Sequence, residues 1–244
     1  KRKNLDRVIT IYSNVLADYT ANEIVAELLD IMAEYPMPRG YFYEFTGEQQ
    51  QQAEDTAFLL GAFLVVIFSI FLILVAQFNS ISSPFIIILS VVFSTIGVFL
   101  GYYFTGRNIA LISTGIGVIS LAGIVVNNAI VLIDYINLLL KRKMDEMGVS
   151  RMSDFPLADA KTAIVEAGGT RLRPVLLTAI TTVLGLVPLA IGLNINFFTI
   201  ITDLDPNYVL GGDNTAFWGP MAWTVIYGLT FATFLTLVVV PVMY

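Results

Sequence analysis

The chain has 244 residues, of which 57% are hydrophobic and only 13% charged, with a formal net charge of −6 at pH 7. Together with a mean hydropathy of +0.79, this composition excludes an ordinary soluble domain and predicts an integral membrane protein. Cysteine is absent, so the chain has neither a disulfide framework nor a thiolate metal site.

Residues 1–56 predict an extramembrane fragment of α+β character. The segments 7–15 and 40–46 are rich in β-branched and aromatic residues, which favours strands, and 21–35 carries apolar residues at helical spacing. The polar stretch 47–56 contains no helix breaker between Gly47 and the first membrane span, which predicts a helix that leads into this span. A strand-helix-strand unit buries little apolar surface, so we expect it to belong to a larger subdomain.

Residues 57–244 predict a membrane domain. Five apolar stretches are each long enough to cross a hydrocarbon core of about 30 Å at about 1.5 Å per residue. We place these spans at about 57–77, 83–104, 108–136, 172–193 and 217–241.

The distribution of cations predicts the orientation of these spans. Lysine and arginine gather between Lys141 and Arg173, whereas the loop 194–216 has none, so the positive-inside rule makes the loop 137–171 cytoplasmic. An odd number of spans then places residues 1–56 and the loop 194–216 outside, and Tyr244 inside. The segment 1–56 has no apolar signal sequence, so we expect the chain to be a piece of a longer polypeptide with preceding spans.

The third span carries a polar stripe at seven-residue spacing. At about 100° per residue, Asn128 points away from its neighbour Asn127 and addresses a different partner. The fourth span repeats the spacing, with Pro174 expected in its first turn. The third-span stripe consists of Ser113, Ser120, Asn127 and Asp134 with Gly117 and Gly123 beside it, and the fourth-span stripe of Arg171, Thr178 and Gly185 with Thr181 and Thr182 beside it.

Two interpretations of these stripes stay open. Small residues let membrane helices approach, and Asn or Thr hydrogen bonds between helices contribute about 0.6–2 kcal/mol each, so the stripes can be packing seams. Alternatively, polar groups at membrane depth often mark an ion pathway. No residue near the middle of the two spans is ionisable, which favours packing on spacing alone.

Two motifs add a family resemblance. "GIVVNNAIVLIDYIN" (123–137) and "AIVEAGGTRLRPVLLTAITTVLGLVPLAIG" (163–192) resemble the resistance-nodulation-division (RND) transporters, specifically their hydrophobe and multidrug efflux branch. "LVAQFNSISSPFIIILSVVFSTIGVFLG" (74–101) matches the same family in the same order. The resemblance implies the C-terminal five helices of a twelve-helix bundle, with 1–56 as a fragment of the periplasmic porter region.

The resemblance also implies roles for individual residues. In the N-terminal half of such transporters, the span matching 108–136 carries adjacent proton-binding aspartates, and the repeat copy in this chain carries Asn127 and Asn128. Relatives place a lysine at the position of Asn127, so this chain departs from the pattern. Arg171 and Thr178 match an arginine and a threonine implicated in the relay, which makes them, with the two asparagines, the candidate coupling residues.

The function implied by the resemblance is proton-coupled export of hydrophobic or amphiphilic solutes from the bacterial inner membrane. Implied partners are the N-terminal half of the transporter, two further copies in a homotrimer, a periplasmic adaptor (membrane fusion) protein, an outer-membrane channel and lipids. Neither a cofactor nor a nucleic acid is expected. Without histidine, cysteine or suitably paired acids, an enzyme is not expected either.

Two alternatives to drug export stay open. RND-type metal efflux is disfavoured because metal exporters tend to use ladders of methionine, and four of the five predicted spans contain none. A membrane scaffold or assembly subunit that has lost the relay is also consistent with the residues, because the aspartate-bearing half lies outside this chain.

Overall fold

The computed structural model describes residues 2–3, 6–14, 21–38, 40–149, 151, 155–195 and 208–244. It divides into two compact units, Lys1–Ala57 and Phe58–Tyr244, which are described separately. In the first unit, strands β1 (Arg2–Lys3) and β2 (Asp6–Arg7) pair antiparallel, and helix α1 occupies Ala21–Glu34. Helix α2, Glu48–Phe78, starts in the polar stretch and continues without a break into the first apolar stretch.

The two longer strands predicted for the first unit do not form over their described residues, except that Arg7 lies in β2; residue 15 lies outside the described residues. Residues 8–14 and 41–46 have no regular structure, and most of their apolar side chains stay exposed, with Ile9 and Ile11 both 89% accessible. A strand needs a hydrogen-bonded neighbour, and no such neighbour lies beside these segments within the described residues. The β-branched residues give these segments a preference for strand structure, but no neighbouring strand is present to pair with them in the described residues.

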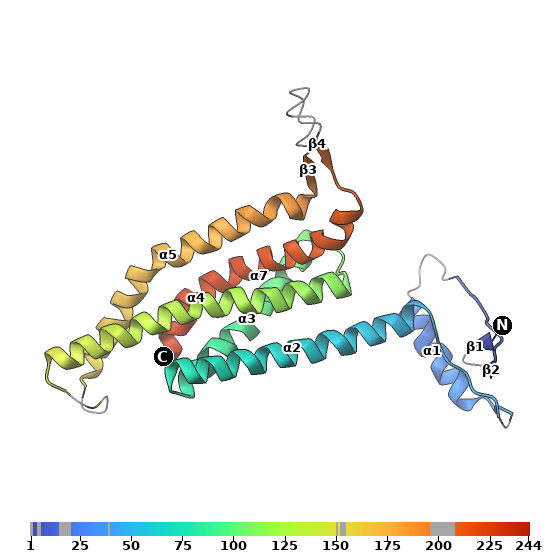
Figure 1. The fold of residues 1–244 in the computed structure, drawn as a ribbon, viewed down its shortest axis with the longest axis horizontal. Helices are drawn as coiled ribbons and strands as arrows, with labels where there is room; N and C mark the ends of the chain where they lie inside the picture. Colours follow the sequence, from blue (N-terminus) through green and yellow to red (C-terminus); the bar gives the residue numbers. More distant parts are fainter. Residues whose placement is uncertain are drawn as a thin grey trace. The chain divides into compact units, whose positions relative to one another are not determined.

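The predicted membrane class is confirmed by five helices that are long and apolar enough to cross a bilayer, within the described residues. After α2, they are α3 (Ser82–Thr105), α4 (Leu111–Glu146), α5 (Leu157–Ile191) and α7 (Asp213–Met243). The last of these helices, α7, packs against α3, α4 and α5 (Figure 1). The shared core includes Val98, Leu121, Ile133 and Leu229, all fully buried.

Small residues allow α7 to approach α3 and α4 closely. A Cβ atom at Gly97 or Gly101 of α3 would collide with Phe231 or Tyr227 of α7, and one at Gly117 of α4 would lie 2.7 Å from Thr224 Cβ. Membrane helices use glycine in this way because packing between them depends on short backbone separations.

The predicted loop 137–171 is largely helical. Helix α4 continues to Glu146, and α5 starts at Leu157, so residues 157–171 form the first part of α5 and continue without a break into the fourth span. Ala160, Ala163 and Ala167 of this part are buried in the core cluster, and this packing sustains the helix. Pro174 therefore lies in the interior of α5, where proline removes one helical hydrogen bond, and not in a first turn.

The predicted loop 194–216 contains a short hairpin at its ends. Strand β3 (Leu193–Ile195) pairs antiparallel with β4 (Tyr208–Leu210), and α7 already starts at Asp213. Gly192 ends α5 with a φ of 72°, a left-handed conformation that glycine adopts without steric cost. Two acids of this loop, Asp203 and Asp205, lie outside the described residues.

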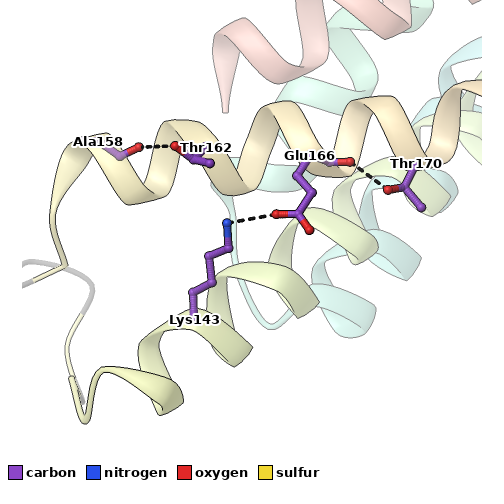
Figure 2. Close-up of polar contacts among 5 residues, drawn as sticks. All are labelled: Lys143, Ala158, Thr162, Glu166 and Thr170. Carbon is purple, nitrogen blue, oxygen red and sulfur yellow. Dashed lines mark hydrogen bonds and ion pairs between the residues drawn. The ribbon is translucent and has the colours of Figure 1, made fainter.

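A salt bridge joins α4 to α5 at the end of the bundle with the most cations. Lys143 Nζ lies 3.0 Å from Glu166 Oε2 (Figure 2), with side chains 23% and 53% exposed. Exposed pairs contribute little because water and salt screen them. We expect a double-mutant cycle with Lys143→Ala and Glu166→Ala to give a coupling of at most about 1 kcal/mol in unfolding free energy. The coupling should vanish at high salt; persistence there would contradict an exposed, screened pair.

Candidate functional site

The polar residues of α4 and α5 meet in two side-chain contacts, Asn128 with Thr178 and Tyr135 with Arg171, which we call rungs. Thr178 Oγ1 donates to Asn128 Oδ1 over 3.3 Å, and the guanidinium of Arg171 lies over the ring of Tyr135, 4.3 Å from its centroid. Asn128 and Tyr135 are seven residues apart on α4, as are Arg171 and Thr178 on α5. Two helical turns therefore separate the rungs on both helices, which run antiparallel.

The rungs have different chemistry. Asn128 is buried, with 6% of its surface exposed, and its amide oxygen accepts from a hydroxyl that also contacts the carbonyl of Val175. The Tyr135 ring attracts the Arg171 cation through its negative face without neutralising it. One rung thus offers a neutral hydrogen-bonding pair, and the other keeps a full positive charge beside the bundle.

Arg171 retains an unused donor. Its Nε is buried and has no hydrogen-bond partner in the described part of the chain. A buried donor without a partner is costly, so this arginine is suited to receive an acceptor such as water or a carboxylate. Asp134, the acid next to Tyr135, is exposed on α4 and forms no ion pair with Arg171 among the described contacts.

Asn127 faces away from the rungs. It is exposed, and so are Ser120, Gly123 and Asp134 of the same predicted stripe. A Cβ atom at Gly123 would meet nothing within 4 Å. This chain therefore leaves a small and polar face of a long apolar helix uncovered, which in a bilayer would present an amide to lipid at a high free-energy cost.

The other stripe residues have separate neighbours. Ser113 and Gly117 are buried, the latter against Thr224 of α7. On α5, Thr182 Oγ1 donates to the Thr178 carbonyl over 2.8 Å, and Gly185 has open space beside it. The structure thus brings together Asn128 with Thr178 and leaves Asn127 apart from both. Their roles in coupling stay predictions.

Sequence reasoning missed two contributors. Tyr135 could have been found because it repeats the seven-residue spacing from Asn128. Tyr102 of α3 had no such signal: its hydroxyl lies 2.8 Å from the Pro220 carbonyl and 2.9 Å from Thr224 Oγ1, and 3.3 Å from Thr114 Oγ1. That network depends on residues distant in sequence and connects α3, α4 and α7.

The Asn128–Thr178 bond permits a direct test. Hydrogen bonds between membrane helices contribute about 0.6 kcal/mol on average in double-mutant cycles and about 1.7 at most. We expect a cycle of Asn128→Leu and Thr178→Val to give a coupling in unfolding free energy within that range. Thr181→Val is the matched control, because Thr181 Oγ1 bonds only to backbone carbonyls of its own helix. A coupling between Asn128 and Thr181 as large as with Thr178 would contradict the geometry.

The model of the AcrB/AcrD/AcrF family matches residues 1–196, four of the five apolar helices among them. The chain belongs to this family. As an AcrB/AcrD/AcrF-family chain, it is part of an RND-type transporter, and its apolar helices place it in a membrane.

Relatives of this AcrB/AcrD/AcrF-family chain include proteins named for different processes. Swarming motility protein SwrC of Bacillus subtilis is 32% identical over 237 residues, 96% of this chain and 20% of the relative. Cobalt-zinc-cadmium resistance protein CzcA of Cupriavidus metallidurans is 29% identical over 243 residues, 100% of the chain and 20% of the relative. Multidrug resistance protein MdtC of Proteus mirabilis is 24% identical over 242 residues, 99% of the chain and 20% of the relative.

A solved structure shares the fold. The crystal structure of a heavy metal efflux pump (crystal form II) superposes with a TM-score of 0.67 and 26% identity, covering 92% of this chain and 19% of the pump. The chain therefore spans about one fifth of the length of the relatives that it matches. Proteins named for metal resistance and for multidrug resistance are both among these relatives.

Proposed function

We propose that the chain is the C-terminal membrane part of a proton-coupled efflux transporter of the bacterial inner membrane. The observation that carries this proposal is the uncovered polar face of α4, with Ser120, Gly123, Asn127 and Asp134 exposed. In a twelve-helix RND bundle, this face would meet the matching span of the N-terminal half. The N-terminal residues and the loop 194–216 would then be periplasmic, and Tyr244 cytoplasmic.

The proposed relay combines the two halves. Two adjacent aspartates in the other half cannot both hold a charge cheaply in a low dielectric, so their protonation depends strongly on neighbouring groups. Asn127 would supply donors and acceptors without charge. Arg171, with its unused buried Nε, would supply the positive charge that relatives take from lysine, and Thr178 would orient Asn128.

The substrate class has two candidates. Hydrophobic or amphiphilic solutes follow from the motifs and from the multidrug relatives. Two observations favour metal cations. The chain superposes on a heavy metal efflux pump with a TM-score of 0.67, and it is similar to CzcA. We propose amphiphile export as the first candidate and cation export as the second. In either case, the transporter would work as a homotrimer with a periplasmic adaptor and an outer-membrane channel.

The test uses the full-length transporter that contains this segment, expressed in a strain without its own efflux pumps. Accumulation of an amphiphilic dye and of Zn²⁺ or Co²⁺ is measured with and without a protonophore. We expect dye accumulation to fall on expression and to recover with the protonophore. Lower metal accumulation with unchanged dye would select the second candidate. Export that is insensitive to the protonophore would overturn proton coupling, and no change in either solute would leave the scaffold alternative as the better account.

A further inference from the structure

A pocket of about 390 Å³ opens at the end of the bundle opposite the cation-rich loop. It lies between the end of α3, the end of α5 and the start of α7. Its walls include Tyr102, Arg107, Asn108, Ala190, Thr215 and Trp223. The volume falls within the range of small-molecule sites, about 300–1,000 Å³.

Arg107 is an unusual cation for this location. Every other lysine and arginine of residues 58–244 lies between Lys141 and Arg173, and the positive-inside rule disfavours cations in short outer loops. Arg107 follows Gly106, whose φ of 61° turns the chain at the end of α3. The position of Arg107 at the pocket rim is therefore not explained by membrane orientation, and it indicates a role in the pocket.

The arginine is held in place without being neutralised. Its guanidinium lies over the Trp223 ring, 4.3 Å from the centroid. Trp223 is itself fixed, because its Nε1 donates to the Ala190 carbonyl over 2.8 Å and its ring stacks on Tyr227 at 5.3 Å. No carboxylate pairs with Arg107 within the described residues, and the contact with the Trp223 ring orients its donors.

The polar groups around the arginine also favour an anion. The side chains of Asn108 and Thr215 have no hydrogen bond among those observed in the described part of the chain, and both line the pocket. By contrast, the Tyr102 hydroxyl at the wall is occupied by Pro220 and Thr224. A guanidinium fork binds phosphate through two parallel hydrogen bonds. Tryptophan is enriched at the headgroup level of a bilayer, and Trp223 lies in the third turn of α7.

We propose that this pocket binds the phosphate of one phospholipid from the outer leaflet, with Arg107 as the phosphate ligand and Asn108 and Thr215 as further donors. The acyl chains would leave the pocket toward the bilayer. The site rests on the proposed orientation of the chain in the membrane and not on the proposed proton relay, which lies between other residues of α4 and α5.

The test uses the full-length transporter purified in detergent and titrated with phosphatidylglycerol under native mass spectrometry. We expect one tightly retained lipid per chain, and about tenfold weaker retention in Arg107→Ala, since bidentate charge-assisted bonds are lost. Arg107→Lys should bind with intermediate strength because a point charge lacks the fork. Arg142→Ala, which removes an exposed cation at the opposite end of the bundle, is the matched control and should retain the lipid.

A second variant distinguishes the contribution of the pocket volume to lipid retention from that of the Arg107 charge. Ala216 lines the pocket and is exposed, so Ala216→Phe should fill the volume and weaken lipid retention while Arg107 stays. Thermal unfolding of each variant in detergent checks that it is folded. Equal lipid retention in the unsubstituted protein and Arg107→Ala would overturn the proposal. So would displacement of the lipid by inorganic phosphate, which indicates a free-anion site, or equal retention of uncharged diacylglycerol, which indicates a merely apolar groove.

Discussion

Replacing Gly101 by alanine is expected to destabilise the membrane domain by about 1–3 kcal/mol, the usual cost of overpacking, although alanine favours a helix by about 1 kcal/mol over glycine. The added Cβ would collide with Tyr227. Tyr227 has little room to move, because its ring stacks on Trp223 and meets Tyr102 edge-on, and its hydroxyl donates to Thr105 Oγ1 over 3.0 Å.

The measurement is the unfolding free energy or the Tm of the full-length transporter in detergent. Gly61→Ala on α2 is the matched control, since a Cβ there would meet nothing within 4 Å. We expect that variant to be as stable as the unsubstituted protein or slightly more so. Equal stability of Gly101→Ala and Gly61→Ala would contradict the close packing of α3 on α7 at Gly101.

Replacing Asn127 by aspartate is expected to reduce proton-coupled export by about tenfold or more, whereas Asn127→Ser stays within about twofold. Asn127 is exposed on the face proposed to meet the aspartate pair. A third carboxylate there would raise the pKa values of the pair, and each pKa unit corresponds to about 1.4 kcal/mol, or a factor of ten in the protonation equilibrium. Serine keeps a neutral hydrogen-bonding group and is small enough for a packed interface.

The measurement is the rate of dye or metal export in cells, together with its dependence on external pH, at matched expression. Asn128→Asp is an informative comparison, because Asn128 is buried against Thr178 within this chain rather than exposed. It should lower stability as well as transport, since a buried carboxylate is costly. Equal export by Asn127→Asp and Asn127→Ser would indicate that this position serves packing only.

The candidate site shows where spacing is informative and where it fails. Seven-residue periodicity predicted that Asn127 and Asn128 have different surroundings, and the structure gives Asn128 a partner in Thr178. Periodicity could not say which neighbour each face meets. It grouped Ser113 and Gly117 with Asn127, whereas the first two are buried and Asn127 is exposed, because burial depends on where α7 crosses α4.

The extramembrane segments show the same limit more strongly. Composition predicted strands at 7–15 and 40–46, but a strand is stable only beside a hydrogen-bonded neighbour, and the described residues provide one for Arg7 but none for 8–14 or 41–46. Likewise, Pro174 indicated a helix start, while the packing of Ala160, Ala163 and Ala167 on the core carries α5 through the proline.

By itself, the sequence determined the membrane class, the five apolar helices and the family, because hydropathy and helical periodicity are local properties of the chain and motif order is a linear one. Only the tertiary structure decided that Tyr135 holds Arg171, that Tyr102 connects three helices, and that Arg107 and Trp223 form a pocket with Ala190. These contacts join residues far apart in the chain. The geometry around Tyr102 and Trp223 also depends on the close approach of α7 that the glycines of α3 and α4 allow, and no local pattern encodes that approach.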